Sequence, residues 1–480
     1  MINALNYRNE IILLISFILV NILMYAFGAG DDAPLRAGAD SGQYLRPARS
    51  LVDYGIFALN PPGWTPEMGE SRSLTFGTPL YSILLALPYY FFEQTVKFYV
   101  AVVFIQCSLL YLIGWLSRYF LPFFGSSRFI LIHALVIFNP NSLTTAHLVQ
   151  SETLFTLFVV LVLLYLFKYI KNGGITNLLI IGASAGMLTL TRPAGMYLVY
   201  MIPIIIILVK FFQFSQNHTN VSFNQNSFVS IFHFTIPIII AFLVMSPWYA
   251  RNYINTNEVY LTSGSGAYIK DNYTTLIHRG RLGVSQQEAF KIADNQQLKY
   301  LKGIGITGLC ISNQSIDVSR NPKCDQYVFD AILNGIIQES FQTHVSALFH
   351  SWGVLYFSGG ASNFRNYIGL KGNSLLVDFQ SEPFQGLKSI NRLIQRMDTG
   401  YFMIFIFFTS FAIISRVYGL VGLYRLIIDS EARLYLIAII GVLGIFTAMY
   451  LYLGQSRFRV PIEPILMLLS VLAISGKKNK

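Results

Sequence analysis

The sequence predicts an all-α polytopic membrane protein that carries one large polar insert. Of its 480 residues, 54% are hydrophobic and only 12% are charged, and the mean hydropathy is +0.52. About a quarter of the residues of a typical soluble domain are charged. At half that density the chain cannot cover itself with a water-facing surface. This excludes an ordinary cytosolic enzyme, a disordered protein and a small disulfide scaffold.

Apolar runs define the order of the elements. The first run, 11–28, follows Arg8 and lacks a small-residue cleavage site, so we interpret it as a retained span. A polar stretch at 29–77 comes next, and a mixed polar segment fills 250–398. A straight span needs about 20 residues, so the shorter runs have uncertain ends. The remaining runs are 78–94, 97–117, 128–139, 151–169, 175–190, 196–212, 229–248, 400–415, 434–453 and 459–475.

Basic residues predict the orientation of the spans. Lys and Arg total 34 and Asp and Glu total 23, which gives a net charge of +11. No basic stripe with interleaved aromatics gathers in one domain, so we expect no nucleic-acid partner. Basic residues of polytopic proteins instead keep cytoplasmic loops inside. The residues that we place inside are Arg8, Arg118, Arg128, Lys168, Lys171, Lys210, Arg416, Arg425, Arg433 and the terminal lysines.

This orientation gives about ten full spans with both termini inside, provided that 78–94 does not fully cross. It also gathers the acidic and unusual polar residues on the outer face. Ionisable groups near membrane depth are costly and tend to be functional. A hydrophobic bundle with a charged outer mouth suits a site that acts on amphiphiles. The residues at this face are Asp31, Asp32, Asp40, Glu67, Glu70, Arg72, Glu152, Arg192, Arg251, Arg457 and Arg459.

The three cysteines indicate no metal site. Cys107 lies in an apolar run and is expected to pack there. Cys310 and Cys324 lie in the polar insert, where an extracytoplasmic location would permit a disulfide. No Cys-x-x-Cys and no His-Glu-x-x-His occurs, so no metal ligands are assigned.

The polar stretch after the first span contains the strongest candidate residue, Asp40. If 41–54 is helical, Tyr44 lies four residues after Asp40 and shares its face. Asp40 has two interpretations from these residues alone. It is either the N-cap of that helix or a carboxylate that takes part in chemistry.

Six short segments, in this order along 38–464, resemble membrane glycosyltransferases of the GT-C fold. These enzymes use polyprenyl-phosphate-linked sugars, and protein O-mannosyltransferases and the lipid A aminoarabinose transferase are among them. The first segment is the loop with Asp40, Tyr44, Ala48, Gly55 and Phe57. The others are Thr78-Pro79-Leu80-Tyr81, Ser151-Glu152-Thr153-Leu154-Phe155, Thr191-Arg192-Pro193, Pro247-Trp248-Tyr249-Ala250-Arg251-Asn252 and Arg457-Phe458-Arg459-Val460-Pro461-Ile462-Glu463-Pro464.

The resemblance implies a GT-C-like bundle of about 10–13 transmembrane helices with an extracytoplasmic mixed α/β insert. The units would be an N-terminal bundle over 1–248, whose outer loop 29–77 is catalytic, a cap over 249–398 and C-terminal helices over 399–480. The protein would be an inverting hexosyl- or pentosyltransferase in the cell inner (plasma) membrane, multi-pass, with its active site on the extracytoplasmic face. Its partners would be a polyprenyl-phosphate sugar donor, an extracytoplasmic acceptor and membrane lipid.

The chemistry explains why these residue types are needed. A hydroxyl acceptor is a poor nucleophile, so a positioned carboxylate must act as general base, and the resemblance gives that role to Asp40. The leaving group is a lipid phosphate, which nearby cations stabilise, and the planar guanidinium of arginine suits phosphate. The candidate arginines could instead simply extend their side chains to the interface. The substrate-binding candidates are Tyr44, Arg72, Glu152, Arg192, Arg251, Arg457 and Arg459.

A second acid often accompanies the first in this fold, and Glu67 and Glu70 fit by position. The sequence lacks the Glu-Lys-Pro-Pro form of the lipid A branch, so no metal ligand is carried over. Whether the protein uses a divalent metal ion as a cofactor therefore remains open. Asp31 and Asp32 fit a solvated turn. Glu152 is either a site residue or an acid that the helix dipole favours at a helix start.

Two other functions remain open. A secondary transporter or lipid flippase would favour two matching halves and charges at the bilayer midplane, whereas the charges here sort to one face. A non-catalytic polysaccharide assembly protein could share a similar bundle, and loss of activity on changing Asp40 would separate it from an enzyme. No Walker motif occurs, which argues against a primary pump.

Overall fold

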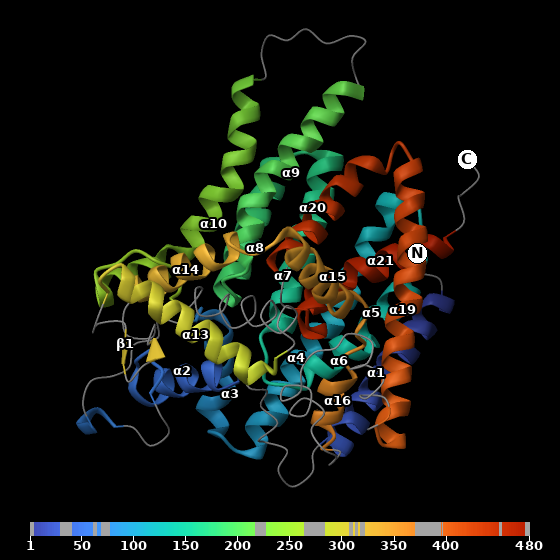
Figure 1. Ribbon diagram of the computed structural model, residues 1–480. Helices are drawn as coiled ribbons and strands as arrows, with labels where there is room; N and C mark the ends of the chain where they lie inside the picture. The colour runs from blue at the N-terminus through green and yellow to red at the C-terminus, as the bar shows by residue number, and fades with distance from the viewer. Residues whose placement is uncertain are drawn as a thin grey trace.

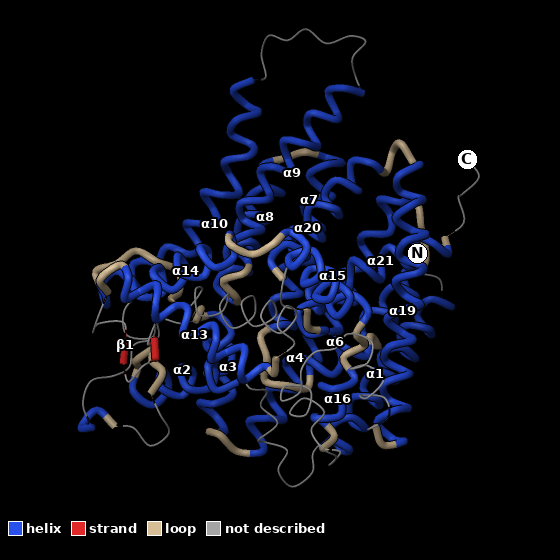
Figure 2. Tube along the Cα trace, viewed as in Figure 1, coloured by secondary structure: helices blue, strands red, loops and turns tan. Residues whose placement is uncertain are grey.

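The structure, a computed structural model, is almost entirely helical (Figure 1). It describes residues 4–28, 41–60, 65–68, 77–216, 227–263, 284–306, 311–312, 315–316, 322–369, 395, 397–450 and 454–475. Within these residues the only sheet is the two-residue antiparallel hairpin of β1 (Ile311–Ser312) and β2 (Ser315–Ile316), visible as short red segments in Figure 2. The predicted all-α polytopic class is confirmed.

The N-terminal half is a helical bundle whose elements follow the apolar runs closely. The polar stretch after the first span contains a helix over 41–54, as predicted. The elements up to the insert are α1 (Ala4–Gly28), α2 (Ser41–Tyr54), η2 (Pro66–Met68), α3 (Leu80–Phe92), α4 (Val96–Ser117), η3 (Arg118–Phe124), α5 (Phe129–Ile137), α6 (Pro140–Ala146), α7 (Glu152–Asn172), α8 (Ile175–Thr191), α9 (Gly195–Gln216) and α10 (Ser227–Thr256).

The apolar run at 128–139 is not a single straight span. It forms α5, which ends at Ile137, and α6 then begins at Pro140 with a bend of 55° between the two helices. The Asn139 side chain caps α6 by accepting hydrogen bonds from the backbone N–H groups of Asn141 and Ser142. Proline at the first helical position and asparagine before it are typical of a helix start, which is the physical reason for the break.

The described residues contain six helices that are long and apolar enough to cross a membrane, or seven if the bent pair counts as one span. Three shorter apolar helices, Leu80–Phe92, Ile175–Thr191 and Arg433–Met449, accompany them. The expected ten full spans therefore include segments that are too short to cross as straight helices. The remaining short helix, α3, lies in the run at 78–94, which the orientation argument did not count among the ten spans.

The C-terminal elements surround a helix that is buried on all sides. They are α19 (Thr399–Ile428), α20 (Arg433–Met449), η5 (Ser456–Ile462) and α21 (Glu463–Ile474). Every residue of α21 from Glu463 to Ala473 is buried. The helix α19 packs along α21, and a Cβ atom at Gly422 would meet the carbonyl oxygen of Leu469 at 1.9 Å. Only glycine permits this approach, as in other close helix pairs of membrane proteins.

Basic residues gather at one end of the bundle, which we call the basic end. Arg118 pairs with Glu10 at 2.6 Å, and the Ser126 and Ser475 hydroxyls lie 2.8 Å apart. Arg425 donates to the carbonyl of Ser475, so both chain ends and the α4–α5 connection meet here. The turn between α19 and α20, at the upper right in Figure 1, follows the last turn of α19, which contains Arg425, and belongs to the same end. These contacts agree with the predicted grouping of the basic loops.

Arg416 departs from that prediction. We expected it in a cytoplasmic loop after a run ending at 415, but α19 continues to Ile428 and encloses it. The Arg416 side chain is only 6% exposed and pairs with Glu463 inside the bundle. The prediction was wrong because a single charge was taken as the end of a span, although an apolar stretch resumes after it.

The insert is built from helices in its described residues. They are α13 (Gln286–Gly303), α14 (Pro322–Ile337), α15 (Phe341–Phe357) and α16 (Ala361–Tyr367). Ser285 caps α13 in a reciprocal box with Glu288, and the hydrogen bonds from Ser285 lower the pKa of that carboxyl group. Cys324 is disulfide-bonded and Cys107 is free. The remaining cysteine of the sequence, Cys310, lies outside the described residues.

The last part of the insert packs into the bundle. The helix α15 contacts η5 and α19, and α16 contacts α6 and α19. Ser351 and Leu355 of α15 are buried, and the Ser351 hydroxyl donates to the carbonyl of Tyr450 at 3.2 Å. At the start of the insert, α10 continues without a break to Thr256. The insert is therefore joined to the bundle at both of its ends.

Candidate functional site

The start of α2 is anchored to the connection between α6 and α7. The hydroxyl of Ser41 is fully buried and donates to the carbonyl of Val149 at 3.0 Å. One turn later the Tyr44 hydroxyl lies 3.0 Å from the hydroxyl of Ser151. The Tyr44 ring meets the ring of Tyr81 edge to face, with centroids 5.0 Å apart. These contacts fix Tyr44 beside the first residue of α7.

That first residue, Glu152, forms an ion pair with Arg192. The Arg192 Nη1 atom lies 2.5 Å from the Glu152 carboxylate, whose side chain is 2% exposed while that of Arg192 is 13% exposed. Arg192 follows the last residue of α8 and precedes Pro193, where the helix ends. The pair thus joins the start of one apolar helix to the end of the next, and its arginine stays partly accessible.

Arg457 enters the same region from η5. Its guanidinium lies 4.8 Å from the ring centroid of Phe458, and that of Arg192 lies 5.5 Å from the same centroid. Phe458 stacks on Tyr450, with centroids 4.7 Å apart and ring planes 17° from parallel. Tyr450 therefore stacks on the ring that the guanidinium groups of Arg192 and Arg457 approach. We call the group of Tyr44, Ser151, Glu152, Arg192, Tyr450, Arg457 and Phe458 the site cluster, and its end of the bundle the site end.

Arg251 holds the segment that follows α2. It donates to the carbonyl of Phe57 at 2.7 Å and lies 4.8 Å over the ring of Trp248. Phe57 in turn meets Trp248 edge to face at 5.5 Å. Arg251 therefore supports the chain between α2 and α3.

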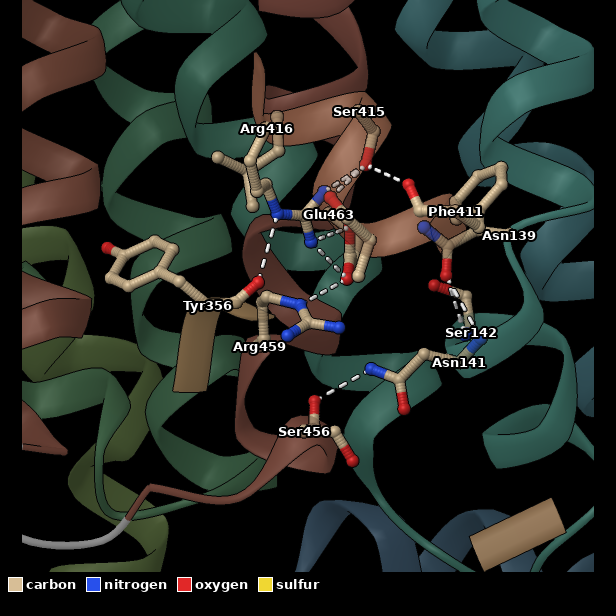
Figure 3. Close-up of polar contacts among 12 residues, drawn as sticks. Asn139, Asn141, Ser142, Tyr356, Phe411, Ser415, Arg416, Ser456, Arg459 and Glu463 are labelled. Atoms are coloured by element: carbon tan, nitrogen blue, oxygen red, sulfur yellow. Dashed lines mark hydrogen bonds and ion pairs between the residues drawn. The ribbon is translucent and has the colours of Figure 1, made fainter. Parts of the chain in front are cut away.

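Arg459 points away from the site cluster into the protein. Its side chain is 1% exposed, its Nε atom lies 2.5 Å from Glu463, and it donates to the carbonyl of Leu355. Arg416 approaches the same carboxylate with Nη2 at 2.9 Å from both oxygens. Figure 3 shows the two arginines converging on Glu463 from different elements. We call Arg416, Arg459 and Glu463 the buried ion cluster.

The predicted site residues thus fall into separate places. Tyr44, Glu152, Arg192 and Arg457 come together, whereas Arg251 and Arg459 make contacts of their own. Glu67 is exposed on η2. The other predicted residues, Asp40, Glu70 and Arg72, lie outside the described residues, as do Asp31 and Asp32.

Sequence reasoning missed Tyr450, Ser151 and Glu463 as members of these groups. Ser151 and Glu463 stood inside the segments that carry the family resemblance, next to Glu152 and Pro464, but they received no role. Tyr450 lies inside the apolar run at 434–453, which was interpreted only as a span. Its position directly after α20, whose last residue is Met449, is the one local signal that it leaves the span.

The described residues contain no group of three or more His, Cys, Asp or Glu side chains that could hold a metal ion. The predicted acids Asp40 and Glu70 lie outside the described residues, so a divalent metal bound by them stays a question posed by the sequence.

No protein-family model matches the chain, and no curated protein matches it. Among solved structures, it is similar to ArnT from Cupriavidus metallidurans bound to undecaprenyl phosphate, with 13% identity, a TM-score of 0.38 and coverage of 94% of this chain and 77% of that chain. It is also similar to the oligosaccharyltransferase AglB from Archaeoglobus fulgidus, in complex with an inhibitory peptide and a dolichol-phosphate. That match has 13% identity and a TM-score of 0.46, and it covers 96% of this chain and 50% of AglB.

The apo form of the Archaeoglobus fulgidus oligosaccharyltransferase matches with 12% identity and a TM-score of 0.48, over 99% of this chain and 51% of that chain. The chain therefore spans about half the length of these oligosaccharyltransferases. All three TM-scores are below 0.5, so the proposals that follow rest on the residues of this chain and not on these likenesses.

Proposed function

We propose that this chain is an integral membrane glycosyltransferase that moves a sugar from a polyprenyl-phosphate donor to an extracytoplasmic acceptor. The acceptor is a hydroxyl group of a glycolipid, a glycan or a protein. The protein is multi-pass in the cell inner (plasma) membrane, with the basic end in the cytoplasm and the site end outside. The sugar is a hexose or a pentose, and the reaction inverts its anomeric configuration.

The site cluster is the observation that carries this proposal. Two arginines, Arg192 and Arg457, lie beside the same aromatic ring at the end of the bundle opposite the basic end. Guanidinium groups bind phosphate oxygens in a fixed fork geometry. A partly accessible arginine pair at the end of an apolar bundle is suited to a lipid phosphate, whose chain stays in the membrane while its head group meets the cations.

The chemical step needs a base and a stabilised leaving group. The acceptor oxygen attacks the anomeric carbon while the bond from that carbon to the phosphate oxygen breaks. The hydroxyl proton passes to the Asp40 carboxylate, and the lipid phosphate leaves with the bonding electrons. Arg192 and Arg457 stabilise the charge that develops on the phosphate. Arg72 is a further proposed phosphate contact, and Arg251 a proposed support of the loop.

The position of Asp40 in the chain supports this role. It directly precedes Ser41, whose side chain is buried against Val149, and it stands four residues before Tyr44 of the site cluster. Glu67 and Glu70 are the alternative acids. Glu67 is exposed on η2, whereas a base that acts in a water-excluded site gains from partial burial.

The test compares the full chain with Asp40→Asn in a strain that lacks the protein. The masses of envelope glycolipids and of surface proteins are measured, with membrane abundance of each variant verified. We expect a sugar-sized mass increment with the unchanged chain and a loss of about 10²–10⁴-fold in its rate with Asp40→Asn. Glu10→Gln is the matched control, because it also removes one carboxylate charge, but at the basic end, and it should retain activity.

Two results would redirect the proposal. An equal increment with Asp40→Asn would contradict the role of Asp40 and transfer it to Glu67 or Glu70. No increment with either form, with both proteins present in the membrane, would contradict the enzyme and favour a lipid or small-molecule transporter or a non-catalytic polysaccharide assembly protein. A transfer rate that a chelator abolishes would establish the divalent metal dependence left open by the sequence.

A further inference from the structure

The segment that carries Arg457 has a conformation that its own backbone hydrogen bonds do not stabilise well. It is η5, a 3₁₀ helix of seven residues with Pro461 inside it. Runs of 3₁₀ helix longer than three or four residues are uncommon because their hydrogen bonds have poor geometry. Pro461 also removes one backbone donor. The conformation of η5 must therefore be maintained by its surroundings.

The buried ion cluster provides this support at the C-terminal end of η5. Arg459 lies inside η5 and Glu463 follows its last residue, with 2.5 Å between the Arg459 Nε atom and the carboxylate. Arg416 of α19 binds both carboxylate oxygens at 2.9 Å and donates from Nε to the carbonyl of Tyr356 at 3.3 Å. With the bond from Arg459 to Leu355, the cluster ties η5 to α19 and to the last turn of α15.

A separate contact fixes the other end of η5. The Asn141 side chain donates to the carbonyl of Ser456 at 2.7 Å, as Figure 3 shows. Asn141 belongs to the first turn of α6, whose start is fixed by the Asn139 cap. Ser456, the first residue of η5, and Glu463, directly after its last residue, are thus both held by polar side chains from neighbouring helices.

Arg457 lies between these two fixed points. Ser456 and all residues from Phe458 to Ile462 are buried, and Arg457 is the one residue of η5 that is not. The fixed ends therefore determine where its guanidinium lies relative to Phe458 and Tyr450.

The charges of the buried ion cluster fit a role in positioning η5 better than a role in stabilising the fold. Its two arginines and one glutamate carry one net positive charge with side chains that are only 1–6% exposed. Burying such charges is costly, and well-packed apolar residues of similar volume are often at least as stable. What the ion cluster adds over apolar packing is directed hydrogen bonds from two arginines to defined oxygens.

We propose that Glu463, together with Arg416 and Arg459, is the positioning group for the phosphate-binding side of the site cluster. It fixes η5 so that the Arg457 guanidinium lies beside Phe458, where the lipid phosphate of the donor binds. This inference rests on the proposed function for the identity of the ligand. Its geometric part, that Glu463 sets the position of Arg457, does not.

The first experiment tests the geometric part alone. Arg457→Cys is made in the full chain with Cys107→Ser, and its rate of modification by a charged, water-soluble thiol reagent is measured in liposomes. Adding Glu463→Gln should change that rate about tenfold, because η5 loses its fixed end. Adding Glu10→Gln is the matched control. It also removes the carboxylate of a Glu–Arg pair, but at the basic end, and should leave the rate unchanged.

The second experiment measures binding of undecaprenyl phosphate to the detergent-purified full chain. Glu463→Gln and Arg457→Gln are combined in a double-mutant cycle. If Glu463 acts through Arg457, Glu463→Gln weakens binding about tenfold in the unchanged chain and less than about twofold in the Arg457→Gln background. A purely structural role would give the same factor in both backgrounds. Folded protein is verified by size-exclusion chromatography for every variant.

The outcomes separate this inference from the proposed function. An unchanged modification rate, or equal factors in the two backgrounds, would overturn the positioning role. A changed modification rate in a chain that binds no undecaprenyl phosphate would support positioning and contradict the proposed donor. If Glu463→Gln does not fold, Arg416→Gln with Glu463→Gln replaces it, because removing both partners leaves less unpaired charge than removing one.

Discussion

Two glutamates begin apolar helices in this bundle, and they differ in the arginines that they meet. Glu152 is the first residue of α7 and Glu463 the first residue of α21, and their side chains are 2% and 1% exposed. Glu152 pairs with Arg192, which stays 13% exposed. Glu463 pairs with Arg416 and Arg459, which are 6% and 1% exposed. A glutamate at the first residue of an apolar helix therefore forms an accessible ion pair in one case and an enclosed ion cluster in the other.

The difference shows how to separate a binding arginine from a supporting one. Arg192 lies beside Phe458 and Arg457, at a place where a ligand oxygen could share its donors. The N–H groups of Arg416 and Arg459 instead donate to Glu463 and to two carbonyls of α15. The accessible pair should therefore control activity, and the enclosed cluster should control stability and position.

The largest effect should follow from breaking the enclosed cluster. Glu463→Gln leaves two arginines buried without their carboxylate, and we expect it to lower the free energy of unfolding by about 3–5 kcal/mol. Thermal unfolding of the detergent-solubilised chain measures this. Glu10→Gln breaks a pair whose side chains are 22% and 24% exposed, and it should cost less than about 1 kcal/mol. Equal costs for the two variants would remove the distinction between enclosed and accessible pairs.

The next effect concerns activity at the accessible pair. Arg192→Gln should reduce the rate of sugar transfer about 10²–10³-fold, or about 2.7–4 kcal/mol, if Arg192 stabilises charge on the leaving phosphate. Single-turnover transfer from a polyprenyl-phosphate sugar measures this. Arg118→Gln is the control, because it removes the arginine of the Glu10 pair at the basic end. A transfer rate that falls equally in both variants would point to general destabilisation in place of a site role.

A smaller effect would show whether the enclosed cluster positions η5 and its Arg457. Replacing all three members with apolar residues, as Arg416→Leu, Arg459→Met and Glu463→Leu, should leave the protein as stable as before or about 1–4 kcal/mol more stable. Transfer activity should still fall, because η5 loses its directed contacts. Unfolding and transfer are measured on the same preparation. Full activity in a stable triple variant would show that packing alone places Arg457.

The sequence predicted the helices better than it predicted their partners. The apolar runs gave the helix positions because membrane helices need long apolar segments. The helix α6 was missed because the predicted run ended at 139, although Asn139 and Pro140 are a cap and a first-turn proline that indicate a new helix. Arg416 was assigned to a loop because an isolated charge resembles the end of a span.

The side-chain pairs could not be predicted from the local sequence pattern. Arg416 and Glu463 are 47 residues apart, and Tyr44 and Ser151 are 107 apart, so each contact depends on how the bundle folds. The orientation of the spans placed Glu152 and Arg192 on one face, where the structure pairs them, but neither it nor the family resemblance could separate Arg457 from Arg459. Two residues apart in a 3₁₀ helix, these side chains point in different directions, one toward the site cluster and one into the protein.

The smallest effect tests the hydrogen bond that brings α2 to the accessible pair. Tyr44→Phe removes the contact with the Ser151 hydroxyl, directly before Glu152, and should cost about 0.5–1.5 kcal/mol of stability. Ser151→Ala should cost a similar amount, and the two together little more than either, because they remove the same bond. Thermal unfolding of the two single variants and the double variant measures the coupling. Simple additivity would mean that this bond does not join the two elements, and that α2 is held to the site end by the Ser41 contact with Val149 and by ring packing against Tyr81 alone.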